Sequence, residues 1–434
     1  MRLLTASALP ERHALISLLV LLLLSFGMLT GTASAQVSAI TPVASPADDN
    51  AYRYLTLENG LEVLLISDPD ADKAAASLNL PVGSGDDPAG REGMAHFLEH
   101  MLFLGTEKYP DPGEYQQFIR SHGGSHNAFT AFQDTNYFFD IQPDQLEPAL
   151  DRFAQQFSAP LFTAELVDRE RNAVHSEYSA SLKEDGRRYF SVRKAITNPA
   201  HSFSQFAVGN LTTLDNPPER PLRDDLIDFW KTHYSANLMT LAVYGPQSLD
   251  ELAAMVTPRF RLIENRDLQT KAHTAPLFAD SFLPARLQVE TLRDIRQLRL
   301  IFPLPSQQER YRDKPVHYVA SLLGHEGPGS LFDVLKSRGL VESLSAGMGT
   351  DTGHETSLEL SLELTPRGLS QEDDIIALAF DYIKLVREQG IAPFRFEEDQ
   401  QLAELDFRFQ ERPSPLHHVM RLSMQMSTGR FWTG

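Results

Sequence analysis

The hydrophobic positions of the chain follow two periods, one typical of strands and one typical of helices. Short apolar runs bounded by turn signals such as Asn-Gly and Asp-Pro predict strands. We expect these strands at residues 54–57, 61–66, 74–82, within 127–141 and at 238–244. Apolar residues that recur every three or four positions predict helices between the strands. We expect these helices at residues 93–104, 112–122, 143–157, 164–182 and 224–233.

The same alternation begins again in the second half of the chain. A stretch that mixes Thr, Ala, Pro and polar groups at residues 269–286 indicates a linker between a domain at 51–268 and a second domain at 287–434. In the second domain we expect strands at 287–291, 298–302, 344–347 and 357–364, and helices near 318–323, at 331–337 and at 373–389. This organisation predicts an α+β fold of two units, each with a mixed sheet packed by helices. We expect the second unit to be incomplete.

Composition and charge exclude several classes of protein. The chain has 434 residues, 42% of them hydrophobic, and contains no Cys. It therefore cannot use cysteine nucleophiles, iron–sulfur clusters, disulfides or Cys-type structural zinc sites. The formal net charge of −19 argues against a nucleic-acid partner, because such proteins need a basic surface.

The first 35 residues have the pattern of a targeting segment. A positively charged start and a short apolar run, followed by Ala33-Ser34-Ala35, predict a secretory signal peptide at residues 1–35. The alternative is an uncleaved membrane anchor, although the apolar run is short for a bilayer span. A polar arm at residues 36–50 would then lead the mature chain. We therefore expect a periplasmic or secreted protein with no stable membrane span after cleavage.

The strongest chemical signal is an H-x-x-E-H pattern in the helix expected at 93–104. His96 and His100 are four residues apart, about 40° around a helix, so both imidazoles leave the same face. Zinc favours neutral nitrogen ligands, and Glu99, which flanks that face, could serve as a general base. The plainer alternative is a pair of ordinary His residues on an amphipathic helix.

Two carboxylates on a second helix are candidates for the third metal ligand. Glu170 and Glu177 are seven residues apart, which places them within about 20° of each other around the helix. One could bind the metal while the other accepts the free ring N–H of a His. A solvated acidic stripe is the alternative interpretation of the same spacing.

Together these motifs resemble the insulinase/pitrilysin family of inverted zinc metallopeptidases, in particular the metal-binding half of its long members. The resemblance runs from Leu57 to about Arg412. The matching segments are ASL at 76–78, VGS at 82–84, DP at 87–88, HFLEHMLFLGT at 96–106, GSHNAFT at 124–130, ERNAVHSE at 170–177, YSAN at 234–237 and GHEGPGSL at 324–331.

The resemblance implies a role for each site residue and two homologous α/β-roll-like domains, the second without metal. His96, His100 and Glu177 would bind one zinc ion per chain, Glu99 would be the general base and Glu170 would support a ligand. A substrate-binding edge strand and a possible anchor for a peptide N-terminus are implied as well. The strand residues are Asn127, Ala128, Phe129 and Thr130, and the anchor residues are Gly324, Gly327 and Gly329.

The function implied is zinc-dependent hydrolysis of peptides and small unfolded polypeptides, through a metal-activated water with Glu99 as base. In the long members an Arg and a Tyr from the C-terminal half face the zinc across a closed chamber. The chamber would therefore need the C-terminal half of the same polypeptide or a partner chain, and the isolated chain could be inactive. Two alternatives stay open, a half-length subunit of a dimeric processing peptidase and a non-catalytic assembly subunit.

Overall fold

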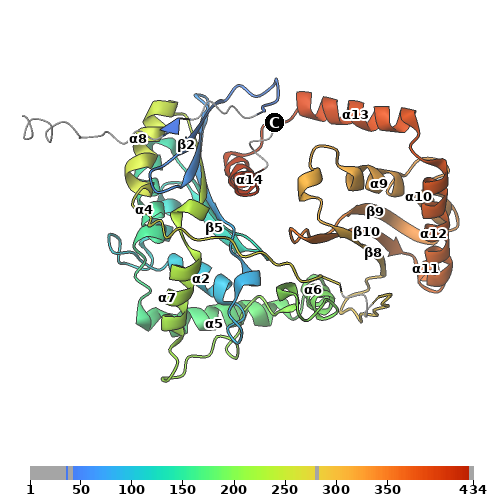
Figure 1. Ribbon diagram of the computed structural model, residues 1–434, viewed down its shortest axis with the longest axis horizontal. Coiled ribbons are helices and arrows are strands. Elements are labelled where there is room, and N and C mark those ends of the chain that lie inside the picture. Colours follow the sequence, from blue (N-terminus) through green and yellow to red (C-terminus); the bar gives the residue numbers. More distant parts are fainter. Residues whose placement is uncertain (1–35, 38–42, 279–282, 430–434) are drawn as a thin grey trace, which may run out of the picture. The chain divides into compact units, whose positions relative to one another are not determined.

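The computed structural model describes residues 36–37, 43–278 and 283–429 (Figure 1). The expected signal peptide at 1–35 lies outside these residues, as do parts of the leader arm and of the linker. No helix within the described ranges is both long enough and apolar enough to cross a membrane.

The larger sheet has seven strands and is mixed. Its order is β1-β2-β3-β7-β4-β6-β5. β3 and β7 are parallel, whereas β7–β4, β4–β6, β6–β5 and β2–β3 are antiparallel. The strands are β1 (Gln36–Val37), β2 (Ala51–Thr56), β3 (Glu62–Ser67), β4 (Ala74–Leu80), β5 (Ser125–Thr130), β6 (Thr135–Ile141) and β7 (Thr240–Gly245).

Helices cover one face of this sheet and enclose the main hydrophobic core. α2, α4, α7 and α8 lie on this face (Figure 1). Their apolar side chains pack against alternate residues of the central strands, which are buried on both faces. The helices of this part are α2 (Met94–Leu102), α3 (Glu114–Ser121), α4 (Leu146–Ser158), α5 (Ala164–Ser181), α6 (Asp185–Ala195), α7 (Leu222–His233) and α8 (Leu249–Phe260).

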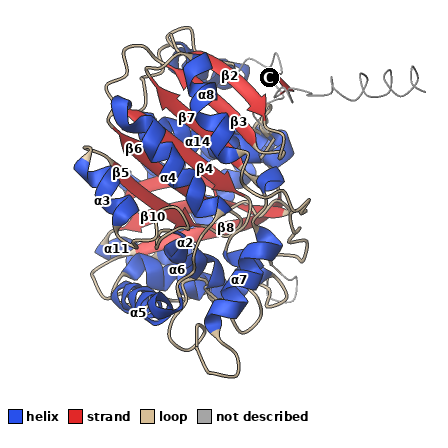
Figure 2. Cartoon of the chain, turned by 90° about the vertical axis from the view of Figure 1, so that its left-hand side faces the viewer, coloured by secondary structure: helices blue, strands red, loops and turns tan. Residues whose placement is uncertain are grey.

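The opposite face of the sheet is covered by a helix from far along the chain. α14 (Pro415–Ser427) lies on the side of the sheet away from α4 and α8 (Figure 1), whereas Figure 2 views the sheet from the side of those two helices. Val419, Leu422 and Met426 of α14 pack against residues of β2, β3, β4 and β7. The sequence assigned residues 287–434 to the second domain, but α14 belongs to the packing of the first sheet. This placement gives the central strands a buried environment on both sides.

A second, smaller sheet carries its own core. It has the order β8-β10-β9, and all its pairs are antiparallel. Residues of α9, α10 and α12 pack against it. The elements are β8 (Gln297–Pro305), β9 (Val341–Met348), β10 (Glu355–Leu364), α9 (Pro315–Leu323), α10 (Leu331–Ser337), α11 (Pro366–Leu369), α12 (Glu372–Gln389) and α13 (Pro393–Arg408). The expected α+β fold, with sheets packed by helices, is confirmed.

Three local expectations differ from the structure. The strand expected at 287–291 is wrong, because these residues are largely exposed and lie in no sheet. The strand signal at 127–141 is a hairpin of β5 and β6 rather than one strand. The helices α6, α8, α11 and α13 were not expected.

Candidate metal centre

The helix α2 holds the two histidines of the motif at a well-buried position. Phe97, Leu98, Met101 and Leu102 are at most 1% exposed and fix the helix against the core. At its N-terminus the buried carboxylate of Asp87 accepts hydrogen bonds from the N–H groups of Gly93 and Ala95, at 2.6 and 2.8 Å. These bonds satisfy free N–H groups at the helix start. Burial raises the pKa of Asp87 to about 8, and the two bonds oppose that rise.

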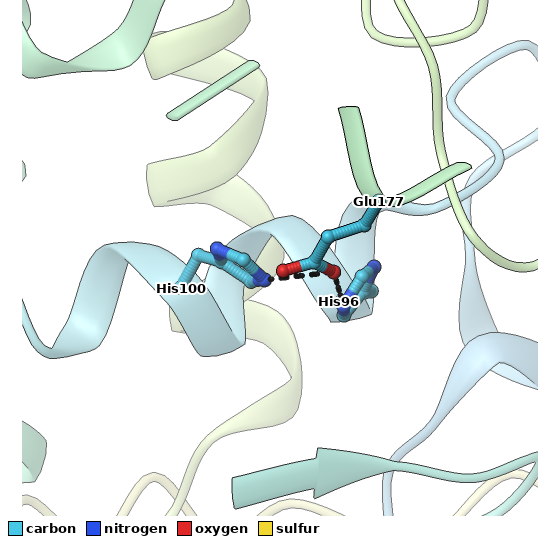
Figure 3. Close-up of side chains that lie close together, drawn as sticks. All are labelled: His96, His100 and Glu177. Carbon is cyan, nitrogen blue, oxygen red and sulfur yellow. Dashed lines mark ion pairs between the residues drawn. The ribbon is translucent and has the colours of Figure 1, made fainter. Parts of the chain in front are cut away.

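The helix α5 brings Glu177 over the two imidazoles (Figure 3). One carboxylate oxygen of Glu177 lies 3.6 Å from His96 Nε2 and 3.7 Å from His100 Nε2. In a tetrahedral zinc site, bonds of about 2.0–2.2 Å separate neighbouring ligand atoms by about 3.4 Å. The three side chains therefore fit a zinc ion, and three protein ligands leave a fourth position open.

Each imidazole uses its other ring nitrogen for a separate contact. His96 Nδ1 lies 2.7 Å from the carbonyl oxygen of Val208, and His100 Nδ1 lies 3.4 Å from Glu170. An N–H at Nδ1 leaves the lone pair of Nε2 directed at Glu177 and available to a metal. Sequence spacing left open which of the two glutamates faces the histidines' metal-binding nitrogens, and the structure places Glu177 there.

The charges of these side chains depend on one another. Burial opposes a positive charge on His100, but its contacts with Glu170 and Glu177 outweigh this and raise the pKa of the ring to about 9. The contact with His100 is the main reason why the pKa of Glu177 is lowered. A divalent cation would displace the proton from His100 and take over its role as the positive partner.

Glu99 lies beside this group and does not belong to it. Its side chain is 7% exposed, and the hydroxyl of Thr130 donates a hydrogen bond of 2.6 Å to its carboxylate. Burial raises the pKa of Glu99, while the charge of His96 and the bond from Thr130 oppose that rise. A carboxyl with a raised pKa can both accept and return a proton, as a general base and acid must.

Comparisons with known proteins identify the family of the chain. The family model described as Insulinase (Peptidase family M16) matches residues 62–206, and the model of the Peptidase M16 inactive domain matches residues 221–402. The chain belongs to the insulinase family, peptidase family M16. The resemblance inferred from the motifs is thereby confirmed.

Two curated relatives and one solved structure in this family have similar sequences. The insulin-degrading enzyme of Homo sapiens is 41% identical over 382 residues, which cover 87% of this chain and 38% of the human protein. The A-factor-processing enzyme of Saccharomyces cerevisiae is 38% identical, covering 87% of this chain and 37% of the yeast protein. The crystal structure of pitrilysin superposes with a TM-score of 0.85 and 34% identity, over 91% of this chain and 42% of pitrilysin. The chain thus spans about two fifths of the length of these proteins.

In this insulinase-family chain, a cavity of about 1110 Å³ opens beside the candidate metal centre. His96, His100, Glu99, Glu170 and Glu177 line it. The residues of β5 expected to bind substrate also line it, namely Asn127, Ala128, Phe129 and Thr130. Since β5 stands at the end of the sheet order, a peptide could pair with its outer edge. Gly324, Gly327 and Gly329 do not line this cavity, and their suggested role stays a prediction.

Two contacts of the site were not anticipated from the sequence. The acceptor for His96 is a backbone carbonyl, that of Val208, in an irregular segment, and no residue type marks such a carbonyl. Thr130 was expected to contribute backbone pairing, whereas its side chain holds Glu99. The alternation of side chains along β5 could have suggested this contact, had its register been known.

Proposed function

We propose that this chain is the metal-binding part of a zinc-dependent endopeptidase that hydrolyses peptides and small unfolded polypeptides. The observation that carries the proposal is the convergence of His96, His100 and Glu177 at distances that suit zinc, with Glu99 beside them and outside the ligand set. A non-catalytic relative would not need to keep both a complete ligand set and an unligated carboxylate.

The residues of the cleft would divide the work of peptide hydrolysis. A bound zinc ion would supply a Lewis acid that polarises a carbonyl and makes water more acidic. The carboxylate of Glu99 would take the proton of the attacking water and give it to the leaving amine. The β5 edge would hold the peptide in extended form by main-chain hydrogen bonds, which tolerate varied side chains.

Metal analysis and peptide cleavage test the proposal together. Purified protein should contain about one zinc per chain, and Glu177→Gln should lose it. Glu99→Gln should keep the metal but lose peptide cleavage, while Glu165→Gln, at an exposed position of the same α5, should change neither. Zinc retained by Glu177→Gln would contradict the ligand assignment, and cleavage unchanged in Glu99→Gln would contradict the base assignment.

We propose in addition that the α12–α13 apolar surface contacts the polypeptide that the longer relatives have beyond this region. The side chains of this surface are between 42% and 69% exposed. They are Phe380, Leu385, Ile391, Phe394, Phe396, Leu402, Leu405, Phe407 and Phe409. Large apolar side chains that are exposed together on two consecutive helices can mark an interface. Amide deuterium exchange in α13 should be slower in the protein isolated from its source than in this chain alone. Equal exchange in the two samples would contradict the proposal. Slower exchange caused by a separate polypeptide chain would identify a partner subunit instead.

The place of action is proposed from the N-terminal sequence. The charge and apolar pattern of residues 1–35 supports export across a membrane, to the periplasm or the exterior. N-terminal sequencing of the exported protein should begin at Gln36. A protein that keeps Met1 and stays in the cytoplasm would contradict this assignment.

A further inference from the structure

The helix α6 forms one wall of the cleft and presents positive charge to it. Arg187, Ser191 and Lys194 stand at i, i+4 and i+7, so they share one face of the helix, and all three line the cavity. The one carboxylate in α6, that of Asp185, does not line the cavity. It accepts hydrogen bonds from the N–H groups of Leu292 and Arg293 instead.

Lys194 is a buried cation that lacks a hydrogen-bonding partner. It is 7% exposed, and its ammonium lies 5.6 and 5.2 Å from the ring centres of Phe190 and Phe203. Across the described ranges, no hydrogen bond or ion pair involves this ammonium. Burial lowers the pKa of Lys194 to about 8, and the nearby carboxyl of Asp87 opposes that fall without a direct ion pair between them. A buried ammonium with no hydrogen-bond acceptor among the described residues is still costly, so an anion in the cavity would be favoured.

Arg187 is the second cation of this wall that is available to a ligand. It is exposed, and its side chain forms no ion pair with any other residue that the structure describes. Its charge helps to lower the pKa of Glu177, which places it near the metal centre. The other two Arg side chains of the cavity are occupied, Arg188 by Asp185 at 3.3 Å and Arg169 by Glu170 at 2.9 Å.

We propose that Arg187 and Lys194 form a subsite for a carboxylate of the bound peptide, so that the protein selects acidic peptides. The inference rests on the proposed peptidase function and specifies its substrate class. The positive wall stands in a chain of net charge −19, so it is a local feature and not a consequence of overall composition. An acidic side chain and a C-terminal carboxylate offer the same chemistry to this wall.

Binding of labelled peptides to zinc-loaded Glu99→Gln protein tests the subsite without turnover. In the first set, the two peptides of each pair share one sequence and a C-terminal amide, and they differ only in having Glu or Gln at one position, which is moved along the sequence. In a second pair, neither peptide has an acidic side chain, and one has a free C-terminal carboxylate while the other has an amide. We expect one carboxylate to tighten binding about tenfold at low salt, and the gain to shrink as salt rises. The two pairs show which carboxylate the wall binds.

Variants of the wall decide whether α6 causes the preference. Arg187→Gln should remove most of the preference, and Arg187→Gln combined with Lys194→Gln should remove it entirely. Arg187 is exposed, so its substitution tests the idea even if the buried Lys194 cannot be replaced without loss of folding. Lys183→Gln changes the same charge outside the cavity and should leave the preference intact.

The outcomes separate this inference from the function on which it rests. Equal binding of acidic and neutral peptides would overturn the subsite and leave the peptidase proposal standing. A preference that persists in both wall variants would also overturn it. If zinc-loaded protein bound neither peptide, the proposed function would fail and the subsite with it.

Discussion

At the two histidines of the metal centre, orientation depends on contacts made away from the metal. Val208 and Glu170 each accept from the Nδ1 position of one ring. These acceptors hold the tautomer in which Nε2 carries the free lone pair, and they limit rotation of the ring. Glu170 is also paired with Arg169, so its carboxylate is itself held in place.

Glu170→Gln should weaken zinc binding by about tenfold or more, because a neutral amide is a poorer acceptor for the His100 N–H. The measurement is competition for zinc with a chelator of known affinity, with Glu165→Gln as the control on the same helix. We expect the zinc stoichiometry at saturating metal to stay at one. An unchanged affinity would show that Glu170 does not support His100.

Thr130→Val removes the hydroxyl that holds Glu99 and keeps the shape of the side chain. A hydrogen bond to a charged group contributes about 1.5–3 kcal/mol, so we expect kcat to fall by about tenfold or more. Zinc content should not change, because Thr130 contacts no ligand. The measurement is steady-state peptide cleavage, made with a form of the protein that has peptidase activity. An unchanged kcat would show that the hydrogen bond from Thr130 does not contribute to catalysis.

The residues of the site were predictable where helical spacing alone decides their position. The i, i+4 pair of His96 and His100 and the seven-residue spacing of Glu170 and Glu177 each fix a shared face. The meeting of α2 with α5 could not be obtained from spacing, because it depends on how two helices pack on one sheet. The acceptor role of Val208 depends on a loop path, which local sequence does not encode.

At the scale of elements, the start of α2 depends on a close approach of two backbones. Gly93 has φ +96°, and a Cβ built there would lie 2.2 Å from the Cα of Gly209. Gly209 follows Val208, whose carbonyl contacts His96. The absence of a side chain at Gly93 therefore allows the loop to reach the metal-binding helix.

Gly93→Ala should destabilise the protein and weaken zinc binding, because the backbone of the loop must move away from His96. Gly90→Ala is a matched control, since Gly90 also has positive φ, at +74°, but a Cβ there meets no atom within 4 Å. Both variants carry backbone strain of about 1–2 kcal/mol. Only Gly93→Ala should lower zinc affinity as well; equal affinities in the two variants would contradict a role for the close approach.

Some elements carried a clear local signal and others did not. α8 begins with a capping box of Ser248 and Glu251, a signal that could have predicted the helix. α10 begins at Leu331 after the Ser330 cap, as the sequence indicated. The strand expected at 287–291 had the right composition but found no neighbouring strand, and without pairing an apolar run stays irregular.

At the scale of the whole molecule, the attachment of α14 to the first sheet could not be predicted from the sequence. Its apolar face is recognisable, but nothing local says which sheet it covers. The contact is partly polar. The buried hydroxyl of Ser423 lies 2.9 Å from Ser77 Oγ and 3.1 Å from Asn136 Nδ2, and its carbonyl accepts from Thr240. Such pairs fix the position of the helix more specifically than apolar contact does.

A buried histidine of α14 should make the packing of this helix on the sheet sensitive to acid. His418 is 6% exposed, lies 3.2 Å from the hydroxyl of Tyr52, and has Arg421 and Asp48 as its charged neighbours. Burial, with a smaller effect from Arg421, lowers the pKa of His418 from 6.5 to about 4. The folded protein therefore holds the ring neutral at pH values where the unfolded chain would already protonate it.

Because the unfolded state binds the extra proton, stability should fall as pH decreases from about 6.5 to about 4. A difference of this size corresponds to at most about 3 kcal/mol. His418→Gln should lose less stability over this range than the unsubstituted protein, whereas His417→Gln, at the exposed neighbouring position, should follow the unsubstituted protein. The measurement is the protection of α14 amides from hydrogen exchange, corrected for the intrinsic rate at each pH. If the protein and His418→Gln lost protection equally, the carboxylates of the sheet and not His418 would control the docking of α14.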